Sequence, residues 1–230
     1  MSERIAKESQ NQIQFDKYCE SGGVILGPYS SHIWRSDPKH LLFLLARYKF
    51  CAKILTGKKE VLEIGCGDSF GTAMVLQTVE QVHGIDIEPL VIEDNIKRLE
   101  YGVRCSYEVL DITSRPLNRK YDGTFALDVI EHIPKDYEKK AMNNILNSLK
   151  PNGICIIGTP NITAQQYASP GSAVGHINLK SGNSLKELMM LYFENVLIFS
   201  MNDEVVHTGF TPMAHYLIGV GLVPNDSVSL

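Results

Sequence analysis

The sequence predicts a doubly wound α/β domain whose β-sheet is mostly parallel. Short apolar runs alternate along the chain with longer stretches of helical periodicity, which is the pattern of repeated strand–helix–strand units with right-handed crossovers. A glycine-rich turn follows the first of these runs, at residues 65–67. A chain of 230 residues is long enough for one such domain with a sizeable core and too short for two.

The first predicted helix spans residues 38–55, where apolar side chains recur at helical spacing. Asp37 is the expected N-cap, Pro38 stands in the first turn, and Gly57 follows the end. Residues 61–64 form a short apolar run that predicts the first strand, and residues 72–79 again have helical spacing.

The alternation continues to the end of the domain. Residues 82–87 predict a strand, 89–100 a helix, 106–110 and 123–127 two strands, 135–149 a helix, 154–158 a strand, 184–190 a helix, and 195–199 and 215–220 two last strands. There is no internal repeat, so the chain is expected to fold as one unit.

Two regions lack a clear period. Residues 159–183 are rich in Gly, Ser, Ala, Asn and Pro, and they leave the carboxyl end of a predicted strand, where open α/β sheets bind ligands. We expect this long loop to line the functional site. The region before Asp37 contains Tyr29 and Trp34, which either close over that site as a lid or form a small hydrophobic cluster.

Composition narrows the class of function. Hydrophobic residues make up 44% and charged residues 21%, as in ordinary globular proteins, which excludes a disordered chain. The net charge of −4 argues against a large surface for nucleic-acid phosphates, so a small-molecule partner is expected.

The cysteines and apolar stretches bear on the compartment. The five cysteines contain no C-x-x-C pair, which indicates neither a disulfide framework nor a thiolate zinc site and favours a reducing cytoplasm. The polar start has no signal-peptide pattern, and charged residues interrupt the apolar stretch 41–55. We therefore expect a cytoplasmic protein without a membrane partner, either a monomer or a homodimer.

The strongest local pattern is Glu-Ile-Gly-Cys-Gly at residues 63–67, directly after the first predicted strand. The two glycines allow a sharp turn and a close approach of a ligand to the backbone. Asp86 ends the next predicted strand, 21 residues after Gly65, where a carboxylate suits the two hydroxyls of a ribose. A dinucleotide fingerprint would need glycine at Phe70, and no Walker loop is present, so a different nucleoside cofactor is expected.

These residues resemble the class I S-adenosylmethionine-dependent methyltransferases. Besides the glycine motif and Asp86, the segments 110–112, 125–133 and 149–153 resemble family motifs in the same order; Ser69 replaces the usual third glycine. The resemblance implies a Rossmann-like sheet of seven strands with the last one antiparallel. We expect a single methyltransferase domain, with an N-terminal cap or lid and helix at 1–57, a cofactor-binding core at 58–160 and an acceptor side at 161–230.

The resemblance also implies which residues bind the cofactor. Asp86 matches the ribose-binding acid, and Asp111 matches the acid that meets the adenine amino group, although a plain turn residue is the alternative there. The full expected cofactor set is Glu63, Gly65, Cys66, Gly67, Asp86, Ile87, Asp111, Ile112 and Asp128. The expected cofactor is S-adenosyl-L-methionine, with S-adenosyl-L-homocysteine as product.

Histidines are the candidate catalytic residues, because an imidazole can remove a hydroxyl proton near neutral pH. His176 lies in the long loop, and His132 and His207 are the other candidates. The stretch around Glu131 resembles ubiquinone-pathway O-methyltransferases, in which acids and a histidine hold a divalent metal. The same Glu-His pair also serves as helix capping, so a metal is possible here and not predicted.

The expected reaction is O-methylation of a small polar metabolite, such as the hydroxyl of a sugar or sugar nucleotide. The alternatives are N-methylation of a small amine and a regulatory protein that binds the cofactor without catalysis. Aminopropyl transfer ranks last, because the loop 159–183 contains no Asp or Glu for a polyamine.

Overall fold

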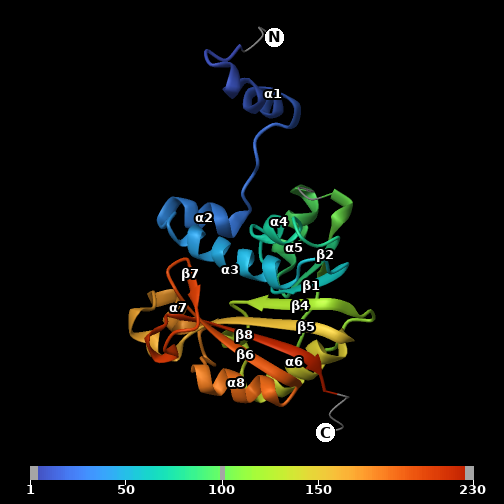
Figure 1. Ribbon diagram of the computed structural model, residues 1–230, viewed down its shortest axis with the longest axis vertical. Helices are drawn as coiled ribbons and strands as arrows, with labels where there is room; N and C mark the ends of the chain where they lie inside the picture. Colours follow the sequence, from blue (N-terminus) through green and yellow to red (C-terminus); the bar gives the residue numbers. More distant parts are fainter. Residues whose placement is uncertain (1–4, 99–101, 226–230) are drawn as a thin grey trace.

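A computed structural model of the protein describes residues 5–98 and 102–225. One sheet of eight strands runs through the domain in the order β3-β2-β1-β4-β5-β8-β6-β7 (Figure 1). The strands β1 to β5 pair in parallel, and β8 runs antiparallel to both of its neighbours, β5 and β6. The strands are β1 (Glu60–Ile64), β2 (Gln81–Asp86), β3 (Cys105–Val109), β4 (Tyr121–Leu127), β5 (Leu149–Pro160), β6 (Phe193–Asn202), β7 (Val205–His207) and β8 (Tyr216–Pro224).

The prediction of seven strands was wrong by one. The extra strand is β7, whose residues pair antiparallel with Ser200 to Asn202 at the end of β6. It arises because β6 turns back on itself at Asp203, which adopts a positive φ of 49°. The other seven strands have the expected arrangement, with β8 as the antiparallel last strand of the chain.

Helices cover both faces of the sheet (Figure 1). The helices α3, α4 and α5 lie on one face, and α6 and α8 lie on the other (Figure 1). The α-helices are α1 (Gln12–Ser21), α2 (Pro28–Ser36), α3 (His40–Ile54), α4 (Thr72–Val75), α5 (Pro89–Arg98), α6 (Lys135–Asn147), α7 (Pro170–Gly175) and α8 (Gly182–Met190). The short 3-10 helices are η1 (Ser9–Asn11), η2 (Gly102–Arg104), η3 (Ile130–His132), η4 (Ile162–Tyr167) and η5 (Thr211–Met213).

The core follows from the alternation of side chains along the strands. On β1, Val61 belongs to the cluster beneath α3 and α4, whereas its neighbour Leu62 belongs to the cluster beneath α6 and α8. Leu55, the C-cap of α3, and Met142 of α6 are among the largest fully buried side chains of the two clusters. The central strands are therefore buried on both faces, as expected for a doubly wound sheet.

The segment predicted as a long loop, residues 159–183, is largely structured. The strand β5 extends to Pro160, η4 and α7 follow, and Asn161 forms a parallel bridge with Lys180. The Asn161 side chain donates hydrogen bonds to the carbonyls of Thr211 and Ala214, both 2.8 Å away. These bonds join residues about 50 positions apart, so local periodicity could not reveal them.

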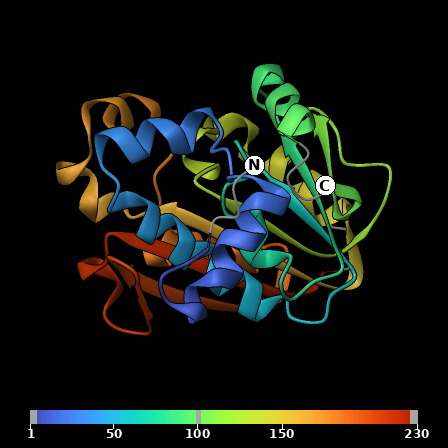
Figure 2. The same ribbon diagram turned by 90° about the horizontal axis from the view of Figure 1, so that it is seen from above.

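The N-terminal region separates into two parts. Helix α1 projects away from the domain and has no buried residue, whereas α2 lies beside α3 (Figures 1 and 2). Asp37 terminates α2, and α3 begins only at His40, so Asp37 is not the predicted N-cap. The helix expected at 72–79 is a single turn, and the predicted end of the helix 89–100 lies outside the described residues. Within the described ranges, none of the helices combines the length and the apolar character that a membrane span requires.

Candidate functional site

The glycine turn at the carboxyl end of β1 adopts backbone conformations that favour glycine. Gly65 has φ +68° and Gly67 has φ +49°. A Cβ atom on Gly65 would lie 2.4 Å from Cγ2 of Val129, the residue that follows β4 by two positions. The turn therefore packs directly against the end of the neighbouring strand β4, and a larger residue at position 65 would separate the two.

Glu63 supports this turn from below. Its buried carboxylate accepts hydrogen bonds from the Tyr48 hydroxyl and the Thr72 hydroxyl, each at 2.7 Å. These contacts connect β1 to α3 and to the start of α4. Burial is the main cause that raises the pKa of Glu63, to about 7. Because Glu63 is buried and its oxygens accept from α3 and from the start of α4, the side chain holds the glycine turn in place.

A pH-dependent stability follows from Glu63. Its folded pKa exceeds the unfolded value near 4.5, so folding retains a proton that the unfolded chain releases, and stability falls as pH rises from 4.5 to 7. We expect a loss of at most about 3 kcal/mol from this group. Glu63→Gln should remove the pH dependence of stability that Glu63 causes, because an uncharged amide can donate to one hydroxyl and accept from the other at any pH. Urea unfolding of both proteins at pH 5 and pH 8 measures the difference, and equal losses in both would contradict it.

Asp86 lies at the end of β2, beside the glycine turn. Its two carboxylate oxygens accept hydrogen bonds from the backbone N–H groups of Gly67, at 3.0 Å, and Glu88, at 2.9 Å. A carboxylate has about four acceptor positions, so two remain for a ligand. Two more residues of the expected cofactor set lie nearby. Ile87, which follows Asp86, is exposed, and Cys66, between the two glycines, is buried.

The acid expected at the adenine lies after β3. Asp111 is exposed, and its side chain accepts a hydrogen bond of 2.7 Å from the Thr113 backbone N–H, which is the geometry of a turn residue. Ile112 is buried and lines a small apolar cavity together with Ile64 and Val129. The structure thus places the Ile112 side chain below the glycine turn and leaves the Asp111 carboxylate at the surface.

Asp128 follows β4 and has a positive φ of 58°. Its carboxylate accepts two hydrogen bonds from the Arg47 guanidinium, at 2.7 and 2.9 Å. Arg47 comes from α3, is buried, and lies over the Tyr216 ring at 3.7 Å from the ring centroid. The charge of Asp128 is therefore compensated within the protein, and this group of three connects α3, β4 and β8.

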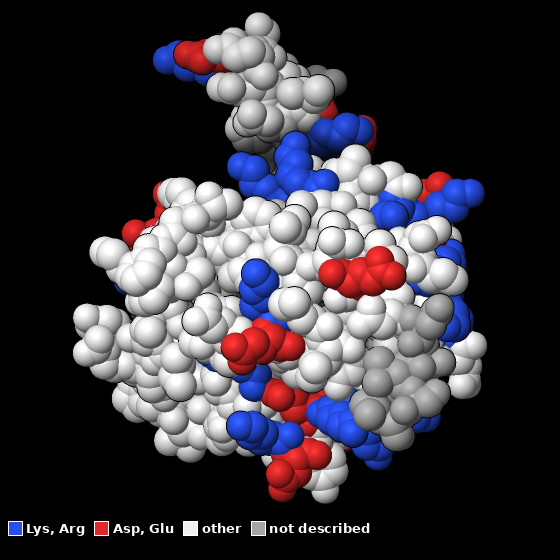
Figure 3. All heavy atoms as spheres, turned by 60° about the horizontal axis from the view of Figure 1, so that its bottom comes forward, with Lys and Arg blue, Asp and Glu red and all other residues white. Residues whose placement is uncertain are grey.

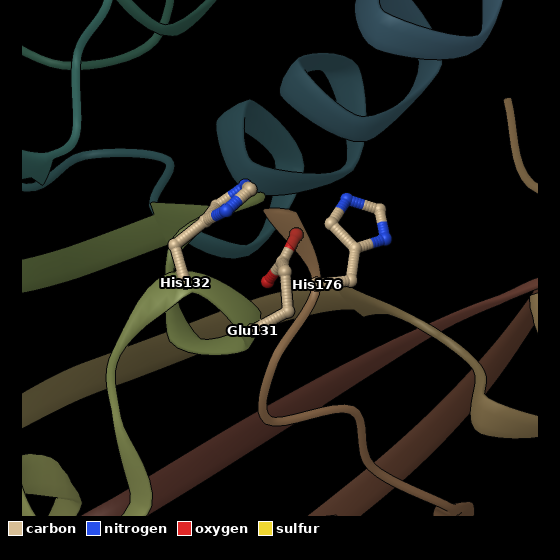
Figure 4. Close-up of side chains that lie close together, drawn as sticks. All are labelled: Glu131, His132 and His176. Atoms are coloured by element: carbon tan, nitrogen blue, oxygen red, sulfur yellow. The ribbon is translucent and has the colours of Figure 1, made fainter. Parts of the chain in front are cut away.

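Two of the three predicted catalytic histidines lie together, beside a buried glutamate (Figure 4). Glu131, His132 and His176 each offer a ligand atom within 4.8 Å of the others, and the two imidazole rings are 5.1 Å apart. Glu131 and His132 belong to η3, whereas His176 follows α7. The two segments are joined by hydrogen bonds from the backbone N–H groups of residues 177 and 178 to the Glu131 carbonyl, at 2.9 and 3.0 Å.

Two polar atoms of this cluster have no hydrogen-bond partner among the described residues. They are Glu131 Oε1 and His176 Nδ1, both buried. Glu131 Oε2 accepts a hydrogen bond from the Thr159 hydroxyl at 3.0 Å, and His132 Nδ1 lies 3.0 Å from the Gly175 carbonyl. Burial and then the Asp128 charge raise the pKa of Glu131, while burial and then His132 lower the pKa of His176.

The third predicted catalytic histidine, His207, is not in this cluster. It lies on β7, where its Nε2 contacts the Asn202 side chain at 2.9 Å and its Nδ1 accepts a hydrogen bond from the Gly209 N–H at 3.0 Å. Both ring nitrogens are engaged in the β6–β7 hairpin, so the structure gives His207 a local structural contact and no place beside His132 and His176.

Sequence reasoning missed three residues that build the site: Arg47, Tyr48 and Thr159. In the sequence, Arg47 is one of the charged residues that interrupt the apolar stretch 41–55. It precedes the buried Cys51 by one helical turn, and a charge on the buried side of a helix needs a partner, so that spacing could have indicated an ion pair. Tyr48 and Thr159 carry no comparable signal, because their partners are distant in the sequence.

The architecture defines a class of protein. A glycine turn after β1, an acid at the end of β2 and an antiparallel strand inserted between β5 and β6 form a Rossmann-like methyltransferase fold. Solved structures share it. The N-methyltransferase NodS from Bradyrhizobium japonicum WM9, in complex with S-adenosyl-l-homocysteine, has a TM-score of 0.60 and 17% identity over 84% of this chain and 92% of that chain. The methyltransferase domain of bacterial CtHen1-C has a TM-score of 0.66 and 18% identity over 80% of this chain and all of that chain.

Sequence comparisons agree with the fold. The methyltransferase domain family matches residues 61–153. The ubiquinone biosynthesis O-methyltransferases of Rickettsia canadensis and Rickettsia felis are each 30% identical over 115 residues, covering 48% of this chain. This chain spans about half the length of the curated relatives it matches, 46% and 45% of the two respectively. Residues 61–153 are thus similar in sequence to a methyltransferase domain, and the chain has the fold of S-adenosylmethionine-dependent methyltransferases.

The residues present fit this cofactor. Asp86 keeps free acceptor positions for a diol, and the absence of a side chain at Gly67 leaves the face of the turn open up to the Tyr29 ring. The residues that would hold the cofactor are therefore the turn 65–67 and Asp86, with Ile87 exposed beside them.

Proposed function

We propose that this chain transfers a methyl group from S-adenosylmethionine to a hydroxyl of a small polar metabolite, a sugar or a sugar nucleotide, and releases S-adenosylhomocysteine. The observation that carries the proposal is the cluster of Glu131, His132 and His176, where a buried carboxylate and two imidazoles converge. The cluster follows β4, at the carboxyl end of the strands, where open α/β sheets bind their ligands.

Oxygen is favoured over nitrogen as the acceptor atom. The curated relatives are named as O-methyltransferases, and they match about half of this chain. A hydroxyl must lose its proton during transfer, which an uncharged amine need not do before attack, and the paired imidazoles supply suitable groups for that purpose.

The acceptor side favours an uncharged molecule. Residues 159–178 and 205–216 contain no Asp, Glu, Lys or Arg, and Asn161 joins the two segments. In Figure 3 the left part of the surface, toward α7, is almost free of charged side chains. Within the proposed class this supports a sugar over a sugar nucleotide, because these segments offer no cation for a diphosphate.

Positioning supplies most of the proposed chemistry. A methyl group moves in line from the sulfonium to an aligned hydroxyl oxygen, so the protein has to hold both reactants and exclude competing water. In this arrangement the imidazole of His176 accepts the hydroxyl proton, and His132 lies beside it. Hydrogen bonds from residues 177 and 178 to the Glu131 carbonyl keep His176 in place.

The same three side chains fit a divalent cation. Each of them offers a ligand atom within 4.8 Å of the others, Glu131 Oε1 has no other partner among the described residues, and a carboxylate with imidazoles suits metals such as Zn²⁺ or Mn²⁺. A bound cation would polarise the acceptor hydroxyl and favour loss of its proton. Glu131, His132 and His176 would hold it.

An acceptor screen tests the proposal. The full chain is incubated with methyl-labelled S-adenosylmethionine and sets of sugars, sugar nucleotides and small amines, and transferred label is counted. We expect label on sugar hydroxyls. Label on amines alone would contradict O-methylation, and tight cofactor binding with no label on any set would favour a regulatory protein.

Chelation separates the two roles of the cluster. With a cation in place, EDTA should reduce methyl transfer by at least about 10-fold, and Zn²⁺, Mn²⁺ or Mg²⁺ should restore it. Cofactor affinity, measured by calorimetry, should stay unchanged, because Asp86 and the glycine turn bind without the cluster. Full activity in EDTA would contradict the cation and leave His176 as the proton acceptor.

A further inference from the structure

The start of helix α2 lies against the glycine turn. Gly27 immediately precedes α2, and a Cβ atom there would lie 2.3 Å from Cβ of Asp68 and 2.8 Å from a guanidinium nitrogen of Arg98. Asp68 directly follows Gly67. Only a glycine allows the helix to begin this close to the turn, so the contact depends on the sequence at both places.

Asp68 caps α2 from outside the helix. Its Oδ2 accepts hydrogen bonds from the Ser30 backbone N–H, at 2.7 Å, and from the Ser30 hydroxyl, at 2.8 Å. Ser30 is the third residue of α2, whose N–H normally bonds to the side chain of the N-cap residue. Gly27 has no side chain to accept that bond, so Asp68, directly after the glycine turn, accepts it instead. Both Asp68 and Ser30 are buried.

The turn side of this contact is fixed by α5. The Arg98 guanidinium donates to the Asp68 carbonyl at 2.8 Å, and the Asn95 side-chain amide donates to the Gly67 carbonyl at 2.7 Å. Helix α1 and the residues before Gly27 have few contacts with the domain (Figure 1). The Asp68–Ser30 contact therefore connects α2, and the chain before it, to the glycine turn.

Tyr29, next to Ser30, lies over the face of Gly67. Its ring carbon Cδ2 is 3.3 Å from the position of a Cβ on Gly67, and 49% of the residue is exposed. Burial and then the carboxylates of Asp86, Glu88 and Asp68 raise the pKa of Tyr29. The backbone N–H of Gly67 donates to Asp86 at 3.0 Å, so the Tyr29 ring packs on the residue that Asp86 holds and lies beside the residues that fit the ribose.

We infer that α2 is a lid on the cofactor site, held closed by Asp68 and Ser30, and that Tyr29 contacts the ribose side of bound S-adenosylmethionine. The inference rests on the proposed use of this cofactor. Tyr29 supplies a hydroxyl and an aromatic ring to the ligand. Asp68 and Ser30 are positioning residues, since they act through α2.

Calorimetric titration of the full chain with S-adenosylmethionine tests the role of Tyr29. We expect Tyr29→Ala to weaken affinity by about 10-fold or more and Tyr29→Phe by about 3-fold, as for the loss of a contact and of one hydrogen bond. Tyr137→Ala is the matched control, because Tyr137 is similarly exposed on α6. Unchanged or tighter binding by Tyr29→Ala would overturn the ribose contact.

Hydrogen exchange tests the lid. In the wild type, S-adenosylmethionine should slow amide exchange across residues 28–36, and in Asp68→Ala, which removes both bonds to Ser30, that protection should be lost while the core strands exchange as before. Equal protection in both proteins would overturn the role of the Asp68–Ser30 contact in holding α2 closed. A folded wild type with no affinity for S-adenosylmethionine would overturn the proposed function itself, whereas a wild type that binds without protecting 28–36 would overturn only the lid.

Discussion

Replacing Glu131 with Gln is expected to reduce methyl transfer at least about 100-fold, the scale found when a group that polarises or orients a reacting centre is lost. The substitution preserves shape and the contact with the Thr159 hydroxyl, yet it replaces a group that can ionise with a neutral amide that cannot. Transfer rates with a saturating acceptor, together with calorimetric cofactor affinity, measure the effect. The affinity should change by less than about 3-fold, because Asp86 and the glycine turn lie elsewhere.

A matched pair of histidine variants controls this result. His176→Ala should lose activity to a similar degree, because its ring offers a ligand atom within 4.8 Å of those of Glu131 and His132. His207→Ala should retain the rate within about 2-fold, since both nitrogens of His207 are engaged in the β6–β7 hairpin. Equal losses in the two histidine variants, or full activity in Glu131→Gln, would contradict the assignment of the cluster.

Asp86→Asn is expected to weaken S-adenosylmethionine binding at least about 100-fold. The two oxygens of Asp86 accept hydrogen bonds from the backbone N–H groups of Gly67 and Glu88. In Asn the side-chain NH2 takes the place of one oxygen, and because it is itself a donor it cannot accept from the N–H group there. The variant thus loses a ligand acceptor and also disturbs the turn that forms the cofactor surface.

Calorimetry with folded protein checks this expectation. Glu93→Gln is the matched control, an acid-to-amide change on the neighbouring helix α5, where Glu93 is exposed and pairs with Lys97. It should bind as the wild type does. If Asp86→Asn, with an unchanged thermal midpoint, bound within about 3-fold of the wild type, Asp86 would have no part in cofactor recognition.

Much of the fold could be predicted because its signals are local. The alternating apolar runs located β1, β2, β4 and β5, and the glycine pattern located the turn after β1. The antiparallel last strand came from the family resemblance and agrees with the position of β8. The strand β7 escaped prediction because three residues carry no period and pair only through the preceding turn.

The candidate site was predicted less completely, for a physical reason. Its contacts connect residues far apart in the chain: His176 meets Glu131 across 45 positions, and Asp128 meets Arg47 across 81. Residue type suggested His132 and His176, and equally His207, since spacing along one chain cannot tell which histidines converge. The cap that Asp68 gives to α2 was invisible for the same reason.

The position of β8 governs the order in which this protein can be assembled on the ribosome. β8 lies between β5 and β6, yet it is made after both. Until residues 216–224 emerge, β5 and β6 each expose an unpaired edge, and such edges readily pair with other chains. The glycine turn and Asp86, by contrast, belong to strands that pair early. A nascent chain could therefore form its cofactor surface before its sheet is closed, and a ligand present during synthesis would stabilise that half first.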